Sequence, residues 1–314
     1  MLRSPSRTLL AALVLPLLLA ACDAGDLAGT ETPAAVAPTS IEAAVAAEID
    51  TASPETMRTA AAVAADAAMG VEAISGPTTI TESGFYTLMN GFTTEGDGIV
   101  IQANNVFLDL GGYTITGPGN KAGRGIVLDG VSRVLVTNGT VETFGIGVQW
   151  LGTDRTAVVG VTVEGGDEFA DPPNGVAPQI GFLLVNSSRN RVLGNVANNT
   201  NLGIFVRGGG SVRNRIIGNR AETGEFGLIG VCYNPAPDTE DPAGPQRDLV
   251  AGNALIGFGV GVQASAGSAE NRFVENLIGY IESPYEDANG TNVFDSTNEL
   301  FQIGGDDARG PVAL

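Results

Sequence analysis

A short phrase that begins with glycine recurs along the chain. Each copy reads glycine, an apolar residue, any residue, a second apolar residue and then usually a polar one. Clear copies begin at Gly98, Gly125, Gly145, Gly181, Gly203 and Gly259, and a looser copy begins at Gly227. The steps between these glycines are 27, 20, 36, 22, 24 and 32 residues. A repeat of this period, lengthened by occasional insertions, predicts a solenoid.

The apolar residues of each phrase occupy its second and fourth positions, as in Ile99 and Ile101 or Ile204 and Val206. Alternation with a period of two is typical of a strand that turns one face inward. A second apolar element follows in each turn, for example Arg191 to Asn195. The 44 glycines argue against a helical solenoid, because glycine inside a helix costs about 1 kcal/mol relative to alanine. Two or three short strands per turn of about 22 residues therefore predict a parallel β-solenoid.

Asparagines recur in register with these second elements. We expect them to stack at a corner as a structural ladder of Asn195, Asn219, Asn253 and Asn276, with a second column of Asn190, Asn214 and Asn271. Stacked amides can satisfy backbone groups at the bends.

The stretch from Asp97 to Gly117 and the repeated Asn-Arg-Val-x-Gly-Asn turns resemble the right-handed parallel β-helix repeat family with the pectin-lyase-like fold. The resemblance covers residues 75–303. It implies an all-β chain, a single-stranded right-handed parallel β-helix of about seven or more rungs. That family includes lyases, hydrolases, epimerases, adhesins and a copper-maturation protein, so the resemblance indicates the fold much better than the function.

The amino terminus has the pattern of an export signal. Arg3 and Arg7 precede an apolar run, and Leu19-Ala20-Ala21-Cys22 resembles a bacterial lipobox. We expect a lipoprotein signal peptide at 1–21, lipid on Cys22, a low-complexity tether at 22–74 and a C-terminal tail at 304–314. The protein would then cross the inner membrane and be lipid-anchored in the cell envelope, on its periplasmic or outer surface. Cys232 would remain a free structural thiol.

Charge excludes several functions. The net charge is −19, the sequence has no histidine, and we find no basic cluster in it. Nucleic acid is therefore not an expected partner, and an anionic polysaccharide would be repelled unless calcium bridged the two. Without histidine there is no Ser-His or Cys-His pair and no imidazole metal ligand. We expect no metal or cofactor, although two insertions carry candidate calcium ligands, namely Asp167, Glu168, Asp171, Asp238, Glu240 and Asp241.

Outward positions of the repeat define a candidate surface. The residues four after each glycine are Gln102, Asp129, Gln149, Val185, Arg207, Val231 and Gln263; those two after it are Val100, Val127, Gly147, Leu183, Phe205, Ile229 and Gly261. Amides, charges and aromatic rings together suit sugars, so the candidate ligand-binding residues are Gln149, Trp150, Phe205, Arg207, Tyr233 and Gln263. The alternative is that a loop or the tether covers this face.

Catalysis has two candidates, Asp129 as an acid and Arg207 as a base, which lie three rungs or about 14 Å apart by strand spacing. No second carboxylate faces Asp129 at the separation that glycosidases require. The favoured interpretation is a lipid-anchored envelope protein that binds carbohydrate or another surface ligand. A polysaccharide lyase or glycoside hydrolase is the alternative, and a structural or adhesive rod is the third reading. Whether the protein is an enzyme and how it oligomerises stay open.

Overall fold

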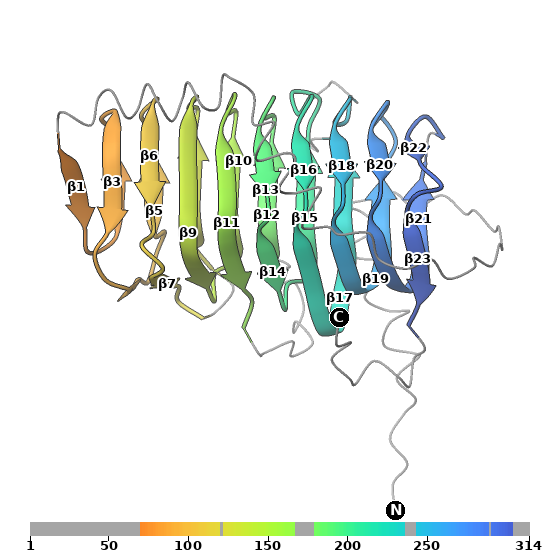
Figure 1. Cartoon of the computed structure of the whole chain (residues 1–314), viewed down its shortest axis with the longest axis horizontal. Coiled ribbons are helices and arrows are strands. Elements are labelled where there is room, and N and C mark those ends of the chain that lie inside the picture. Colours follow the sequence, from red (N-terminus) through yellow and green to blue (C-terminus); the bar gives the residue numbers. More distant parts are fainter. Residues whose placement is uncertain (1–69, 120–121, 167–178, 236–242, 289, 304–314) are drawn as a thin grey trace, which may run out of the picture.

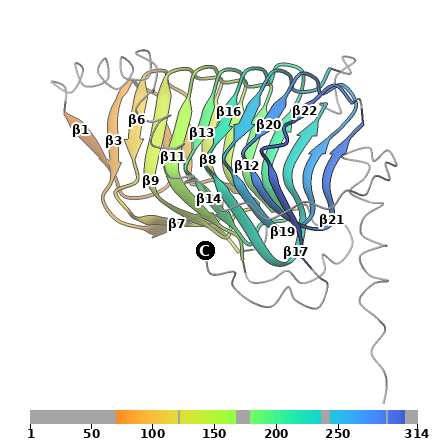
Figure 2. The same ribbon diagram turned by 45° about the vertical axis from the view of Figure 1, so that its right-hand side comes forward.

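The computed structural model describes residues 70–119, 122–166, 179–235, 243–288 and 290–303. These residues form short parallel strands that wind, coil after coil, along the long axis of the molecule (Figure 1). Each coil contributes a strand segment to each of three faces, as the turned view in Figure 2 shows. The predicted all-β parallel β-helix is confirmed. Among the described residues no helix has the length and apolarity needed to cross a membrane.

We name the faces the first, second and third sheet in the order in which a coil visits them. The first sheet contains β2 (Thr78–Ile80), β5 (Ile99–Ile101), β8 (Arg124–Asp129), β10 (Ile146–Leu151), β12 (Ile180–Val185), β15 (Leu202–Arg207) and the C-terminal parts of β17 (Arg220–Asn234), β19 (Ala254–Ala264) and β21 (Leu277–Asp287).

The second sheet contains β1 (Val71–Ile74), β3 (Gly84–Leu88), β6 (Val106–Asp109), the N-terminal parts of β9 (Val134–Glu142) and β11 (Ala157–Glu164), then β13 (Arg191–Leu193), β16 (Arg215–Ile217), β18 (Leu249–Ala251), β20 (Arg272–Val274) and β22 (Val293–Phe294). The third contains β4 (Phe92–Thr93), β7 (Thr114–Thr116), β14 (Val196–Asn198), β23 (Glu299–Gln302) and the remaining parts of β9, β11, β17, β19 and β21. Strand β1 starts at Val71, inside the stretch expected to be tether.

The register of the first sheet differs from the sequence expectation in three coils. Strand pairing aligns Gly98, Gly125, Gly147, Gly181, Gly203, Gly230 and Gly261. The phrases read from Gly145, Gly227 and Gly259 were therefore placed two or three residues too early, because each of these coils offers two glycines at compatible spacing. A Cβ on Gly203 would lie 2.6 Å from the carbonyl oxygen of Gly230, so the column needs glycine where successive coils approach.

The interior is a stack of apolar side chains from the positions one and three after each aligned glycine. Its members in the first sheet are fully or almost fully buried: Ile99, Ile126, Val148, Phe182, Ile204, Val231 and Val262, and Ile101, Leu128, Trp150, Leu184, Val206, Tyr233 and Ala264. Apolar burial on this scale, at roughly 25 cal/mol per Å², is the main stabilising contribution.

The first asparagine column lies between the second and third sheets. Its members are Asn195, Asn219, Asn253, Asn276 and, beyond the expected four, Asn298. The Asn219 amide donates to Asn253 Oδ1 at 2.9 Å and to the Val192 carbonyl at 2.8 Å, and its own oxygen accepts from the Asn195 backbone N–H at 2.9 Å. Each buried amide thus satisfies backbone groups of neighbouring coils at the bend.

The residues of the second column directly precede the strands of the second sheet. One of them is an aspartic acid that the sequence pattern did not predict. Between Asn214 and Asn271 stands Asp248, which is 1% exposed. Burial raises the pKa of Asp248 to about 8, against the lowering effect of hydrogen bonds from Asn214 and of Tyr233. Asp248 therefore occupies an asparagine position in a largely protonated form at neutral pH.

Candidate functional site

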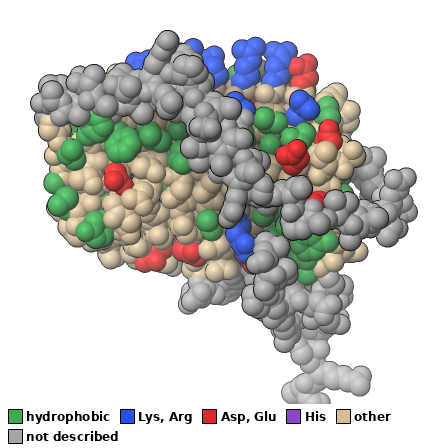
Figure 3. All heavy atoms as spheres, viewed as in Figure 1, with side chains coloured by type: hydrophobic (Ala, Val, Ile, Leu, Met, Phe, Trp, Pro, Cys, Tyr) green, Lys and Arg blue, Asp and Glu red, His purple; other side chains and the backbone are tan. Residues whose placement is uncertain are grey.

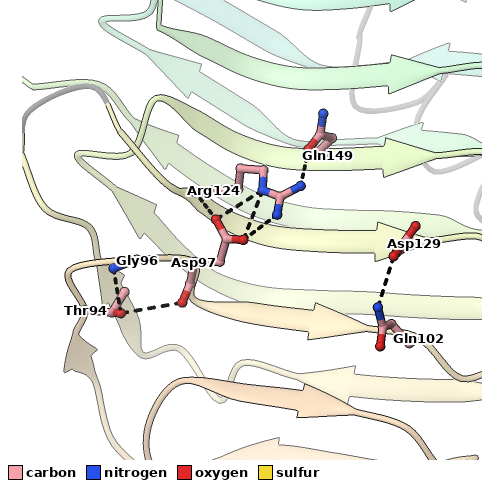
Figure 4. A network of polar contacts seen from close by, with 7 residues as sticks. All are labelled: Thr94, Gly96, Asp97, Gln102, Arg124, Asp129 and Gln149. Carbon is pink, nitrogen blue, oxygen red and sulfur yellow. Dashed lines mark hydrogen bonds and ion pairs between the residues drawn. The ribbon is translucent and has the colours of Figure 1, made fainter.

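The outward surface of the first sheet has a polar half. In β5, β8 and β10 and the residues next to them it carries five polar side chains, which we call the polar cluster: Asp97, Gln102, Arg124, Asp129 and Gln149 (Figure 4). Their place follows from the strand register, since positions before the aligned glycine, two after it and four after it all face outward.

An ion pair organises one end of the polar cluster. The Arg124 Nε lies 3.1 Å from both carboxylate oxygens of Asp97, and the Arg124 backbone N–H donates to the same carboxylate at 2.9 Å. Hydrogen bonds from the guanidinium are the main reason that the pKa of Asp97 lies below its usual range. Arg124 Nη1 also donates to Gln149 Oε1 at 3.2 Å. A guanidinium fixed on two sides is a preorganised donor for a ligand.

The other end of the polar cluster is more open. Gln102 Nε2 donates to Asp129 Oδ2 at 3.1 Å, and both side chains are exposed. Asp129 and Asp97 are separated by one coil and by five residues along the strand direction, which corresponds to about 16 Å. Figure 4 shows the two carboxylates well apart, with Arg124 beside Asp97. This is wider than the separation of at most about 9.5 Å between paired glycosidase carboxyls.

The other half of the same surface is apolar and buried. Its members form an outer apolar cluster of Ile180, Leu183, Leu202, Phe205, Ile229, Cys232 and Val260, each 9% exposed or less. These side chains lie outside the coil interior yet are withdrawn from solvent. The residues of this half are therefore not an open ligand platform.

Two candidate ligand-binding residues were assigned to the wrong face. Trp150 and Tyr233 are each 0% exposed and belong to the interior stack. The Trp150 indole donates to the Thr156 hydroxyl at 2.8 Å inside the coil. The error follows from the register, because both residues lie three after an aligned glycine, Gly147 or Gly230. Val231 likewise points inward.

The remaining candidates keep an outward position but do not form one site. Gln149 and Gln263 are 8% and 4% exposed, and Gln263 donates to Glu286 at 2.5 Å. The Arg207 guanidinium lies 5.9 Å from the centre of the Phe205 ring, on the apolar half. Strand pairing places Arg207 three coils from Asp129 in one column, so the two catalytic candidates do not meet.

Asp97 and Arg124 were missed by sequence reasoning, which counted only positions after each glycine. The signal that marks them is the residue directly before the aligned glycine. This position is charged in these two coils, whereas in later coils it is apolar: Ile146, Ile180, Leu202, Ile229 and Val260.

Cation binding and cysteine chemistry were the remaining expectations. Within the described residues no group of three or more acidic or cysteine side chains is placed to hold a metal ion. The six candidate calcium ligands of the insertions, and Cys22, lie outside the described residues. Cys232 is disulfide-bonded and 0% exposed, so the expectation of a free thiol is wrong. The sequence contains one other cysteine, Cys22.

Comparison with known proteins gives the following matches. The family described as "Right handed beta helix region" matches residues 71–278. No curated protein sequence matches the chain. Among solved structures, the Dettilon tailspike protein is 15% identical with a TM-score of 0.39 over 74% of this chain, and a tailspike protein variant of E. coli bacteriophage HK620 is 14% identical with a TM-score of 0.39 over 79%. The chain spans 61% and 62% of the length of these two proteins.

Proposed function

Because the chain belongs to the family of right-handed β-helix proteins, a fold that serves binding proteins and enzymes alike, we propose that it is a carbohydrate-binding protein of the bacterial cell envelope. The ligand lies on the polar cluster. The observation that carries this proposal is the guanidinium of Arg124, held between Asp97 and Gln149 while its side chain remains 36% exposed. Planar donors and acceptors in fixed positions are what hydroxyl groups of a sugar require.

Binding is favoured over catalysis by the spacing of the charged groups. Hydrolysis with two carboxyls would need Asp129 and a second acid within reach of one glycosidic bond, and Asp97 lies about 16 Å away along the strand. Elimination from a uronate would need a base beside a bound carboxylate. Arg207, the candidate base, lies three coils from Asp129 against Phe205.

A panel of envelope polysaccharides and their oligomers tests the proposal. We expect at least one to bind the purified β-helix and to bind at least tenfold more weakly to Asp129→Asn, with no release of reducing or unsaturated ends. Glu142→Gln is the matched control, since Glu142 also accepts a side-chain hydrogen bond, at 2.7 Å from Thr116, but lies on the third sheet. Absence of binding to the whole panel would refute the proposal. Turnover that Asp129→Asn abolishes would show the enzyme alternative.

We also propose export, with lipid anchoring through Cys22 as the alternative to a disulfide between Cys22 and Cys232. The leader carries the lipobox-like Leu19-Ala20-Ala21-Cys22, and a disulfide at Cys232 is typical of an oxidising compartment outside the cytosol. One sulfur cannot carry both a lipid thioether and a disulfide. Metabolic palmitate labelling that Cys22→Ser abolishes is the expected result for the anchor. A disulfide between Cys22 and Cys232 in protein without label would contradict the anchor and leave export in place.

A further inference from the structure

Five successive coils place an arginine at the end of the turn from the first sheet to the second. We call them the arginine row: Arg133, Arg155, Arg189, Arg213 and Arg247. All five are exposed, and the next coil has the exposed Glu270 at the same position. The five are 22 to 34 residues apart in the sequence, which is why a search of the sequence for a basic cluster finds nothing. The expectation that the protein has no basic cluster is therefore wrong, because the fold brings these arginines into one row.

The alignment of the row follows from strand pairing two residues further on. Leu135 pairs with Ala157, Ala157 with Arg191, Arg191 with Arg215, and Arg215 with Leu249. One arginine therefore stands on each coil, at about 4.8 Å per coil, and the four steps of the row extend over about 19 Å.

The backbone of the row is strained, and this indicates that the side chains matter. Each arginine has a φ of 52° to 60°, in the left-handed region, which costs roughly 1–2 kcal/mol for a residue with a Cβ. At the next turn of the coil, a second column of residues also has φ in the left-handed region. In four coils the residue at that turn is glycine, namely Gly160, Gly194, Gly218 and Gly252. Glycine would serve the first column equally well on backbone grounds alone.

The row concentrates positive charge on a protein of net charge −19. Three further arginines, Arg191, Arg215 and Arg272, lie two residues after a position of this column, so eight of the eleven arginines in the described part of the chain lie along this edge. Figure 3 shows several basic side chains along one long edge, whereas acidic side chains lie along the opposite edge and at scattered places on this face.

Two acidic side chains form ion pairs with arginines of the row but do not neutralise the row. Asp154 lies 2.6 Å from Arg189 and 3.6 Å from Arg155, and Glu270 lies 2.6 Å from Arg247. The three arginine side chains remain 43% to 54% exposed. Exposed pairs of this kind contribute little stability, and here they hold guanidinium groups in line while leaving them accessible.

We propose that the arginine row binds a linear acidic polysaccharide with one carboxylate on each sugar, lying along the coil axis. A sugar ring is about as long as one coil step, and the carboxylates on one side of a straight 1,4-linked chain recur at every second sugar. They can therefore meet every second guanidinium group of the row, and a guanidinium binds a carboxylate through paired N–H donors. Duplex DNA fits less well, since each strand advances only about 3.4 Å per phosphate. Binding to a bilayer surface would require a broad basic face with apolar side chains that insert into it. The arginine row has only one arginine per coil and lies along an edge of the β-helix.

The negative net charge of the protein repels an anionic ligand mainly through acidic side chains that lie away from the row. At physiological ionic strength the screening length is about 8 Å, so a ligand seated on the guanidinium groups interacts chiefly with them. Binding through the row needs no bridging calcium. This surface begins at the edge of the first sheet, where Arg133 follows Asp129 of the polar cluster by four residues. The proposal does not depend on the polar cluster.

A charge-reversal pair tests the proposal on the intact chain, with an oligomannuronate of about a dozen sugars as the probe and EDTA throughout. Glu270→Arg extends the row by one coil, and we expect it to tighten binding at least threefold. Glu275→Arg is the matched control: Glu275 is exposed, has a φ of 52° in the same coil, and lies about 16 Å away along the strand direction. We expect no more than a small effect from it.

The converse variant replaces Arg189, Arg213 and Arg247 together by asparagine, which tolerates the left-handed conformation. We expect binding to fall at least tenfold while the melting temperature is unchanged or higher, and wild-type binding to weaken steeply between 0.05 and 0.5 M salt. Unchanged binding in this variant would overturn the proposal, as would tighter binding of wild type to anionic lipid vesicles or duplex DNA than to the oligomannuronate. An Asp129→Asn variant that binds this probe like wild type would show that the two sites are independent.

Discussion

The Oδ1 atom of the Asp248 carboxyl accepts a hydrogen bond of 2.6 Å from the backbone N–H of Asn214, at a position in the second column where neighbouring coils use asparagine. The Asn214 amide lies 3.3 Å from both carboxylate oxygens. An asparagine here would accept the same backbone bond without a titratable group. The protein therefore carries an ionisable residue inside an otherwise neutral ladder.

Asp248→Asn should raise the free energy of unfolding and flatten its dependence on pH. The unfolded chain releases this proton near pH 4 and the folded chain near pH 8, so the folded state binds more protons between these values. Wild-type stability must then fall as the pH rises from about 4 to about 8. Denaturant unfolding at pH 5, 7 and 9 measures this. Equal slopes for wild type and variant would contradict the buried, raised pKa.

Gly203→Ala should destabilise the β-helix by about 1–3 kcal/mol, the magnitude typical of overpacking a well-packed interior. The new Cβ would lie 2.6 Å from the Gly230 carbonyl oxygen and 2.7 Å from the Ala221 Cβ, and both are backbone or short side-chain atoms that cannot move aside. Gly76→Ala is the control, because nothing lies within 4 Å of a Cβ there. Thermal unfolding should separate the two variants clearly, and a wild-type melting temperature for Gly203→Ala would refute the assigned register.

Asn219→Ala should cost about 2–4 kcal/mol. It removes the acceptor for the buried Asn195 N–H and the donor to the Val192 carbonyl, and buried groups left unpaired cost about 1–3 kcal/mol each. Asn198→Ala, which removes a partly buried bond to Glu164, is the control and should cost much less. Similar losses in urea unfolding of the two variants would show that the ladder contributes no more than a surface contact.

The fold could be predicted from the sequence because its determinants are local and repeated. Alternating residues such as Ile204 and Val206 indicate a strand, and the return of asparagine in successive coils indicates a shared corner. The strand register was harder to predict from the sequence. Where a coil has two glycines, as at Gly145 and Gly147, only the contact between successive coils selects one, and this contact is not visible in a single phrase.

The sites could not be predicted for a related reason. Asp97 and Arg124 are 27 residues apart in the sequence and meet only because adjacent coils stack. Trp150 was given an outward place because its coil was read from the wrong glycine. The arginine row depends on five coils stacking in register, although each arginine stands alone in its own stretch of sequence.

Calorimetric titration of the strongest-binding glycan into Arg124→Ala and Arg220→Ala tests the central claim most directly. Both arginines pair with a carboxylate, Asp97 or Glu222, and their side chains are similarly exposed, at 36% and 39%. A hydrogen bond to a charged group contributes about 1.5–3 kcal/mol, so we expect the Kd to rise tenfold or more in Arg124→Ala and to stay within about twofold in Arg220→Ala. Equal affinities in the two variants, with both folded, would contradict a ligand site on the polar cluster.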